Sequence, residues 1–215
     1  MSAAKDAEPA ALEERWNSAT HAVGAVLSVA ATAVLVTWAA RTGGAGLIVG
    51  VAVFGASLIL LYTASALYHT ASPGRLRRRL RALDHAAIYL LIAGSYSPFV
   101  LGPLRGPWGW SLFGVVWGLA VLGVVFKVGW TGRLHRLSMA TYIAMGWLVL
   151  VAVVPLVARL EPFTLAWLVA GGMAYTLGTL FFRLQHMPYA HTAWHLWVMA
   201  GSACHGVAVA SLLGP

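Results

Sequence analysis

Long apolar runs alternate with short polar segments along almost the whole chain. Each run has about 20 residues or more, which is the length that an α-helix needs to cross the ~30 Å hydrocarbon core of a bilayer. Backbone amides in lipid must be hydrogen-bonded inside their own segment, so the runs are predicted to be helices. The pattern predicts an all-α, polytopic membrane protein whose single domain, residues 19–213, is a seven-transmembrane helix bundle. The predicted spans are 19–40, 46–70, 83–102, 108–128, 135–158, 162–182 and 190–212.

The composition agrees with a membrane protein, because 60% of the 215 residues are hydrophobic and only 9% are charged. The exception is the polar N-terminal tail, residues 1–18. It lacks a basic segment followed directly by an apolar core, so it is predicted to be a short disordered or interfacial tail and not a signal peptide. The single cysteine, Cys204, excludes an intramolecular disulfide and is predicted to be a small packing residue.

The basic residues lie mainly on one side of the predicted bundle. If the N-terminus is inside, only three of the fourteen lysines and arginines fall in outer segments, and these are Arg41, Arg105 and Arg159. Inner loops of membrane proteins carry the excess of positive charge, so the N-terminus is predicted to be cytoplasmic and the C-terminus outside. This bias explains the net charge of +8, and no nucleic-acid partner is predicted.

The densest basic stretch is RLRRRLR, residues 75–81, between the second and third spans. A topology determinant in a solvated loop explains it without further assumptions. The alternative is attraction of anionic lipid headgroups to Arg75–Arg81, at about 1 kcal/mol per charge.

Ionisable side chains inside membrane spans are costly, so they mark candidate functional positions. Of the six acidic residues only Asp84 enters a span. His69 ends the second span, and His191 and His195 open the seventh. In the predicted orientation the second span ends inside, while the third and seventh begin there. These four residues are therefore predicted to lie at one depth, toward the cytoplasmic side.

His191 and His195 lie on one helix face, about 6 Å apart along the axis. With this spacing one helix can supply two imidazoles to one metal ion, and His69 can supply a third from a neighbouring helix. Three neutral imidazoles and an open fourth position describe a catalytic Zn²⁺ site, which acidifies its bound water. The alternative is a pair of interfacial histidines that are hydrogen-bonded to their neighbours.

Two further residues are candidates for catalysis beside the predicted metal. Asp84 could accept a proton from the water or hold it by a hydrogen bond. Ser65 is one turn deeper than His69 on the same face, where it could orient the water or a substrate carbonyl.

The other histidines are weaker candidates for metal ligands. His21 opens the first span and is expected to hydrogen-bond near the site. His205 lies about 15 Å along the axis from the histidine pair and on another face, so it is predicted to be a packing residue. An interfacial role is predicted for His85. His135 and His186 lie near inner loop ends, where solvated histidines are ordinary.

Four motifs follow one another along the chain: NSATHAVG (17–24), SALYHT (65–70), LDHAAIYLLIAGSYSPF (83–99) and HTAWHLWVMAGSACH (191–205). In these motifs the chain resembles the haemolysin III-related family, the bacterial branch of the progestin and adiponectin receptor superfamily. The resemblance implies a multi-pass protein of the cell inner (plasma) membrane with a cytoplasmic N-terminus. It also implies Zn²⁺ held by the histidine of SxxxH and the two of HxxxH, here His69, His191 and His195. Asp84 is similar to the aspartate that holds the zinc-bound water, and Ser65 corresponds to the serine of SxxxH.

The resemblance extends to a wider superfamily that includes alkaline ceramidases, which hydrolyse the amide of a lipid. It therefore implies a zinc-dependent amidase with a membrane lipid or lipid-like substrate, and a role in membrane lipid or energy homeostasis. The alternative is a non-enzymatic membrane regulator or sensor with structural zinc. A cytolysin ranks third, because a compact seven-helix chain gives no physical picture of a pore.

Overall fold

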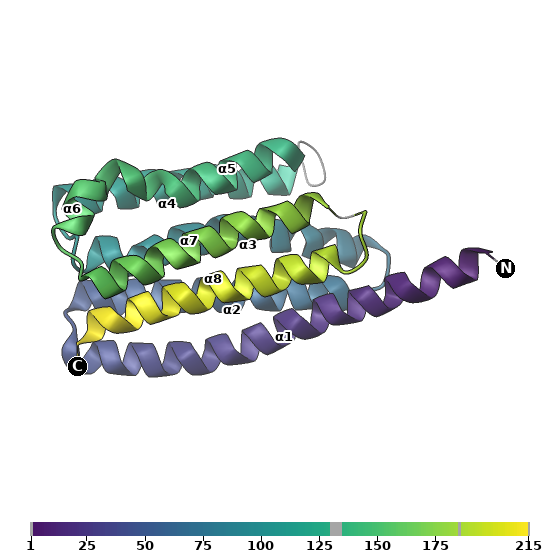
Figure 1. The fold of residues 1–215 in the computed structure, drawn as a ribbon, viewed down its shortest axis with the longest axis horizontal. Helices are drawn as coiled ribbons and strands as arrows, with labels where there is room; N and C mark the ends of the chain where they lie inside the picture. The colour runs from purple at the N-terminus through teal and green to yellow at the C-terminus, as the bar shows by residue number, and fades with distance from the viewer. Residues whose placement is uncertain (1, 130–134, 185, 215) are drawn as a thin grey trace.

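The computed structural model describes residues 2–129, 135–184 and 186–214, and of residues 2–10, 135 and 136 it describes the backbone alone. Seven membrane-length helical segments lie side by side in one bundle (Figure 1), and the described ranges contain no strand. The predicted all-α class and the number of spans are thus confirmed. The segments are α1 (Ser2–Thr42), α2 (Ala45–Thr70), α3 (Arg75–Leu101), α4 (Pro107–Gly129), α5 (His135–Trp147) with η1 (Leu148–Ala152) and α6 (Val153–Val157), α7 (Pro162–Arg183), and α8 (Ala190–Ala210) with η2 (Ser211–Leu213).

The outer surface of the bundle is apolar, as a protein surrounded by lipid requires. Large side chains such as Val26 and Val154 are 70% and 77% exposed. Six segments are long and apolar enough to cross a membrane. The seventh, α3, is equally long but carries the arginines of residues 75–81 and Asp84. The chain is a multi-pass membrane protein, and which end of the bundle is cytoplasmic stays a prediction.

The packing order brings α1, α2, α3 and α8 together. Helix α1 packs against α2 and α8, α2 against α3, and α7 against α8. Helices α2 and α3 approach each other closely because glycines stand at their contact: a Cβ atom at Gly50 would lie 2.6 Å from the carbonyl oxygen of Ser97. The C-terminal end of α2 and the N-terminal ends of α3 and α8 meet at one end of the bundle (Figure 1), which we call the site end.

The predicted tail, residues 1–18, is continuous with the first span in the described backbone. Helix α1 begins at Ser2 and runs through residue 18 without interruption. The stretch AALEERW (10–16) consists largely of strong helix formers, which extend the apolar span beyond the site end of the bundle. Side-chain contacts of Glu14, described below, hold this extension against α2.

The third predicted span also begins too late. Helix α3 starts at Arg75 and not at residue 83, so the basic run 75–81 forms its first two turns and is not a loop. Arginine and leucine both favour helix, and Pro73 and Gly74 separate the run from α2. Of the other inner basic residues, Arg133 lies outside the described residues, as does the side chain of Arg136.

The fifth predicted span, 135–158, is broken into α5, η1 and α6. Pro155 has no backbone N–H to donate, and the surrounding run LVLVAVVP is rich in β-branched residues. The hydroxyl of Tyr96, on α3, enters the break. It donates to the carbonyl oxygen of Met145 at 2.7 Å, lies 2.9 Å from that of Gly146, and accepts from the amide of Val149 at 3.0 Å. One phenol thus satisfies backbone groups that lipid could not.

Replacing Tyr96 with phenylalanine is expected to lower stability by about 1–3 kcal/mol, because it leaves buried backbone groups without a partner. The measurement is the Tm of the detergent-purified protein. Tyr142→Phe is the matched control, since its hydroxyl donates one hydrogen bond, to His85 O at 2.9 Å, and bridges no helix break. Equal losses in the two variants would contradict a special role of Tyr96.

Candidate metal centre

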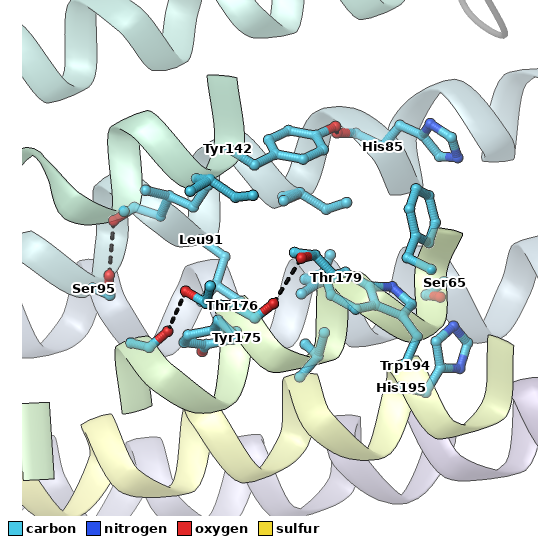
Figure 2. Close-up of a pocket in the computed structure, with 18 of the residues that line it drawn as sticks. Ser65, His85, Leu91, Ser95, Tyr142, Tyr175, Thr176, Thr179, Trp194 and His195 are labelled. Atoms are coloured by element: carbon cyan, nitrogen blue, oxygen red, sulfur yellow. Dashed lines mark hydrogen bonds between the residues drawn. The ribbon is translucent and has the colours of Figure 1, made fainter. Parts of the chain in front are cut away.

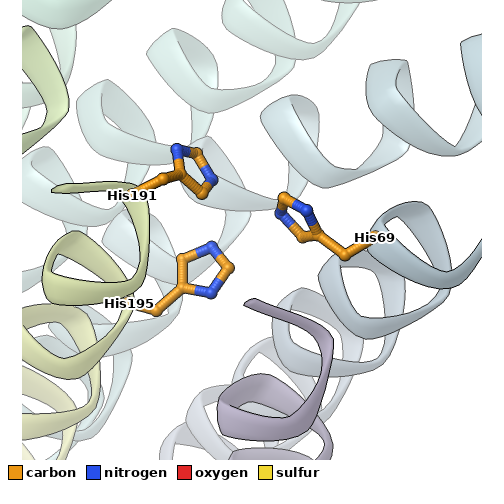
Figure 3. A group of neighbouring side chains, drawn as sticks. All are labelled: His69, His191 and His195. Atoms are coloured by element: carbon orange, nitrogen blue, oxygen red, sulfur yellow. The ribbon is translucent and has the colours of Figure 1, made fainter. Parts of the chain in front are cut away.

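Three histidines converge at the site end of the bundle (Figure 3), His69 from the end of α2 and His191 and His195 from the first turns of α8. One ring nitrogen of each lies within 4.8 Å of one ring nitrogen of both others. The ring centroids are 4.7–5.0 Å apart. These three are the residues that the sequence predicted as ligands.

His69 is oriented by a carboxylate from α1. Its Nδ1 lies 2.7 Å from Oε2 of Glu14, which must accept the Nδ1 proton. The second ring nitrogen, Nε2, is buried and has no hydrogen-bond partner among the described residues. With the proton on Nδ1, Nε2 keeps its lone pair. A buried nitrogen without a partner is costly, so Nε2 is suited to bind a metal ion or to accept a hydrogen bond.

Helix α1 also orients the ring of His195. Its Nδ1 donates to the backbone carbonyl of Asn17 at 3.1 Å, with the hydroxyl of Thr20 at 3.3 Å. The side chain of Asn17 accepts a hydrogen bond of 2.6 Å from Thr192. Because Nδ1 carries the proton, Nε2 is left as the ligand atom. His195 itself is only 2% exposed.

This donor set fits a metal ion. Ligating histidines in proteins usually give their other nitrogen to a carboxylate or a backbone carbonyl, and here His69 has the first partner and His195 the second. Three imidazoles suit zinc, copper, iron or nickel. The three histidines could therefore hold a metal ion.

His21 lies beside the three histidines but is not one of the converging group. Its ring stacks on that of His195, with centroids 3.6 Å apart and planes inclined by 12°, and its edge meets Tyr62. It is 3% exposed, and neither ring nitrogen has a hydrogen-bond partner in the described part of the chain. A hydrogen bond near the site was one role that the sequence left open for His21; among the described residues the structure shows stacking that fixes the plane of the His195 ring.

A cavity with about 120 Å³ of free space begins beside the histidines and extends along the bundle (Figure 2). Asp84 and Ser65 line it together with His191 and His195. Asp84 is buried and lies near His69 and Ser65. Among the described residues, the hydroxyl of Ser65 has no hydrogen-bond partner of ordinary geometry. The structure thus brings both predicted catalytic residues near the three histidines, while their catalytic roles stay predictions.

The rest of the cavity wall is mostly apolar and comes from α3, α5, α7 and α8, with Leu91, Tyr142 and Trp194 among its side chains (Figure 2). Such a cavity fits a hydrocarbon chain better than a polar solute.

Glu14 and Asn17 are site residues that the sequence analysis missed. Both lie in the predicted tail, for which no helix face was predicted. A signal was present: Glu14, Asn17 and His21 are spaced three and four residues apart, so they share one face of a helix. That face lies against α2 and α8 at the site.

The basic run also contributes to the site. Arg77 donates to Oε1 of Glu14 at 2.9 Å and to the carbonyl oxygen of Ala71 at 2.7 Å. Its guanidinium lies 4.9 Å from the ring centroid of Tyr68. Arg77 therefore holds the carboxylate that orients His69.

The remaining histidines lie in three kinds of environment. His85 lines the cavity, His205 lies at the end of the cavity far from the three ligands, and His186 is exposed in the α7–α8 connection. The side chain of His135 lies outside the described residues.

Replacing Glu14 with alanine is expected to weaken metal binding about 10- to 100-fold, the usual effect of losing a partner that orients a ligand. The measurement is metal affinity by competition with a chelator. Glu13→Ala removes the same charge about 100° around the helix and should bind metal as the unchanged protein does. Equal affinity in both variants would show that Glu14 does not support His69.

Comparisons with known proteins agree with the motifs that form this site. The haemolysin-III related family matches residues 10–206. The chain is 43% identical to Hemolysin-3 of Bacillus cereus over 191 residues, which cover 89% of this chain and 87% of the relative. It is also 43% identical to the Hemolysin-3 homolog of Bacillus subtilis (strain 168), over 89% of this chain and 90% of the relative.

A more distant relative is the human monocyte to macrophage differentiation factor, 28% identical over 169 residues, which cover 73% of this chain and 67% of that protein. The matched residues 10–206 include Glu14, all three converging histidines, Asp84 and Ser65. The chain therefore belongs to the haemolysin-III related family, the bacterial branch of the progestin and adiponectin receptor superfamily.

Proposed function

We propose that this protein is a zinc-dependent membrane hydrolase that cleaves the amide of a lipid, as ceramidases do, with a role in membrane lipid or energy homeostasis. The observation that carries the proposal is the convergence of three imidazoles, two of them oriented by α1, beside a largely apolar cavity that Asp84 and Ser65 also line. A structural metal would not need a largely apolar cavity beside it.

The histidines, Asp84 and Ser65 each have a separate role in such a reaction. His69, His191 and His195 would hold Zn²⁺, which when bound acts as a Lewis acid and makes water a better nucleophile. Asp84 takes a proton from the attacking water and returns it to the leaving nitrogen. Ser65 donates a hydrogen bond that orients the amide carbonyl. The apolar wall binds the acyl chain and excludes other water from the site.

The test is a screen of detergent-purified protein against lipid amides, from simple N-acyl amines to ceramides. Each assay is run as purified, after chelation, and after reloading with Zn²⁺. We expect release of fatty acid that is lost on chelation and restored by zinc. Full zinc content without hydrolysis of any amide in the panel would contradict the proposal.

A second candidate is a non-enzymatic regulator in which zinc ties helices together. Its supporting observation is that the ligands come from α2 and α8 and that α1 orients two of them. This function predicts a large fall in Tm on chelation, together with biological activity that does not depend on Asp84.

A further inference from the structure

The end of the cavity far from the metal centre carries a second set of polar groups. Tyr175, Thr176, Ser95 and His205 all line it, at some distance from His195 (Figure 2 labels the first three). His205 is ten residues beyond His195 on α8, or about 15 Å along the helix axis. Polar side chains at this depth of a membrane bundle are costly unless they have hydrogen-bond partners.

The hydroxyls at this end are already used within the protein. Tyr175 shares a hydrogen bond of 2.8 Å with Ser202, which also accepts one from Tyr62 at 2.7 Å. Thr176 donates to the carbonyl oxygen of Gly172, and Ser95 donates to that of Ile92. None of these hydroxyls calls for a ligand.

His205 differs from them. Its Nε2 lies 3.3 Å from the carbonyl oxygen of Leu168, so Nε2 carries the proton and Nδ1 is left as an acceptor. Nδ1 is buried and has no partner in the described part of the chain. The expectation that His205 is a satisfied packing residue thus holds for one ring nitrogen only.

The packing of α7 against α8 fixes the position of the His205 ring. Helices α7 and α8 make room for it with Gly171, where an added Cβ would collide with Cδ2 of His205. The ring also meets Tyr175 edge to face, with centroids 5.4 Å apart. The imidazole is therefore held in place, its ring lines a largely apolar cavity, and its Nδ1 is left as an unpartnered acceptor among the described residues.

We propose that the cavity binds an acyl chain that carries a hydroxyl group about 15 Å from the carbonyl at the metal centre, and that this hydroxyl donates a hydrogen bond to Nδ1 of His205. The inference rests on the proposed function, because it places the reacting carbonyl beside the three histidines. It adds a substrate class: hydroxylated acyl chains are preferred over plain chains of the same length.

The test measures binding and not turnover. Zinc-loaded, detergent-purified protein is titrated with a series of fatty acids of increasing length, each compared with the acid of the same length that has a hydroxyl at its far end. We expect about tenfold tighter binding of the hydroxylated acid at one chain length, and no preference for shorter acids, because the gain is one hydrogen bond to a buried acceptor.

Two variants assign the preference to His205. His205→Phe keeps a ring without an acceptor and should remove the preference while it still binds plain acids. His205→Asn places an amide near the position of Nδ1 and should restore part of the preference. A preference that survives in His205→Phe, or plain and hydroxylated acids that bind equally at every length, would overturn the inference. If zinc-loaded protein binds no acid of either kind, the proposed function fails first and the inference falls with it.

Discussion

Replacement of His69 with alanine is expected to reduce bound metal from about one ion per chain to background. His69 is the only one of the three converging histidines that α2 provides, and the two that remain are neighbours on α8. Two ligands on one helix turn cannot close a site, so the loss of affinity should exceed the roughly 10- to 100-fold expected for a residue that only orients a ligand. The measurement is elemental analysis of protein purified without chelator.

A stability measurement separates metal loss from unfolding. Metal that binds only the folded state stabilises it, so the His69→Ala variant should match the chelated unchanged protein in Tm. His186→Ala is the control, because His186 is exposed in the α7–α8 connection and should leave both metal content and Tm as they are. Full metal content in the His69→Ala variant would refute the three-histidine centre.

Replacement of Asp84 with asparagine is expected to lower amide hydrolysis about 10²- to 10⁴-fold while metal content stays unchanged. Asparagine has nearly the same shape but cannot take a proton from water, so the substitution removes proton transfer and little else. Asp84 is not one of the converging ligands, which is why the metal should remain. The two measurements are the rate of fatty acid release and elemental analysis of the same preparation.

Thr179→Val is the matched control for Asp84. Thr179 also lines the cavity, and its hydroxyl donates to the carbonyl oxygen of Thr176 at 2.7 Å. Its loss should change hydrolysis only a few-fold. If Asp84→Asn leaves hydrolysis intact, the proton is handled by another group, and if the unchanged protein has no hydrolysis to lose, the regulator becomes the better account.

The convergence of the three histidines could be predicted from sequence because membrane topology fixes the depth of each helix end. Apolar span lengths and the basic bias placed the end of one helix and the starts of two others at the same level, and that was enough to bring His69, His191, His195 and Asp84 together. The helix spacing of His191 and His195 then supplied the shared face.

The supporting residues were harder to predict because their roles depend on helix faces and on partners far away in sequence. Glu14 falls in the segment predicted to be a tail, although its spacing from Asn17 and His21 indicates one helix face. The break in the fifth span could not be located, since the phenol that stabilises it comes from Tyr96 on α3. Tyr96 lies 49 residues before Met145 in the sequence.

The candidate metal centre combines residues from the first, second and last spans, and this order has a consequence for biogenesis. A chain made from its N-terminus inserts α1 and α2 well before α8 is synthesised. Glu14 and His69 can meet early, but no ion can be held until the final span arrives with its two imidazoles. If the three histidines hold Zn²⁺ as proposed, the ion can be captured only after α8 is inserted, and a chain truncated before α8 would lack two of the three ligands.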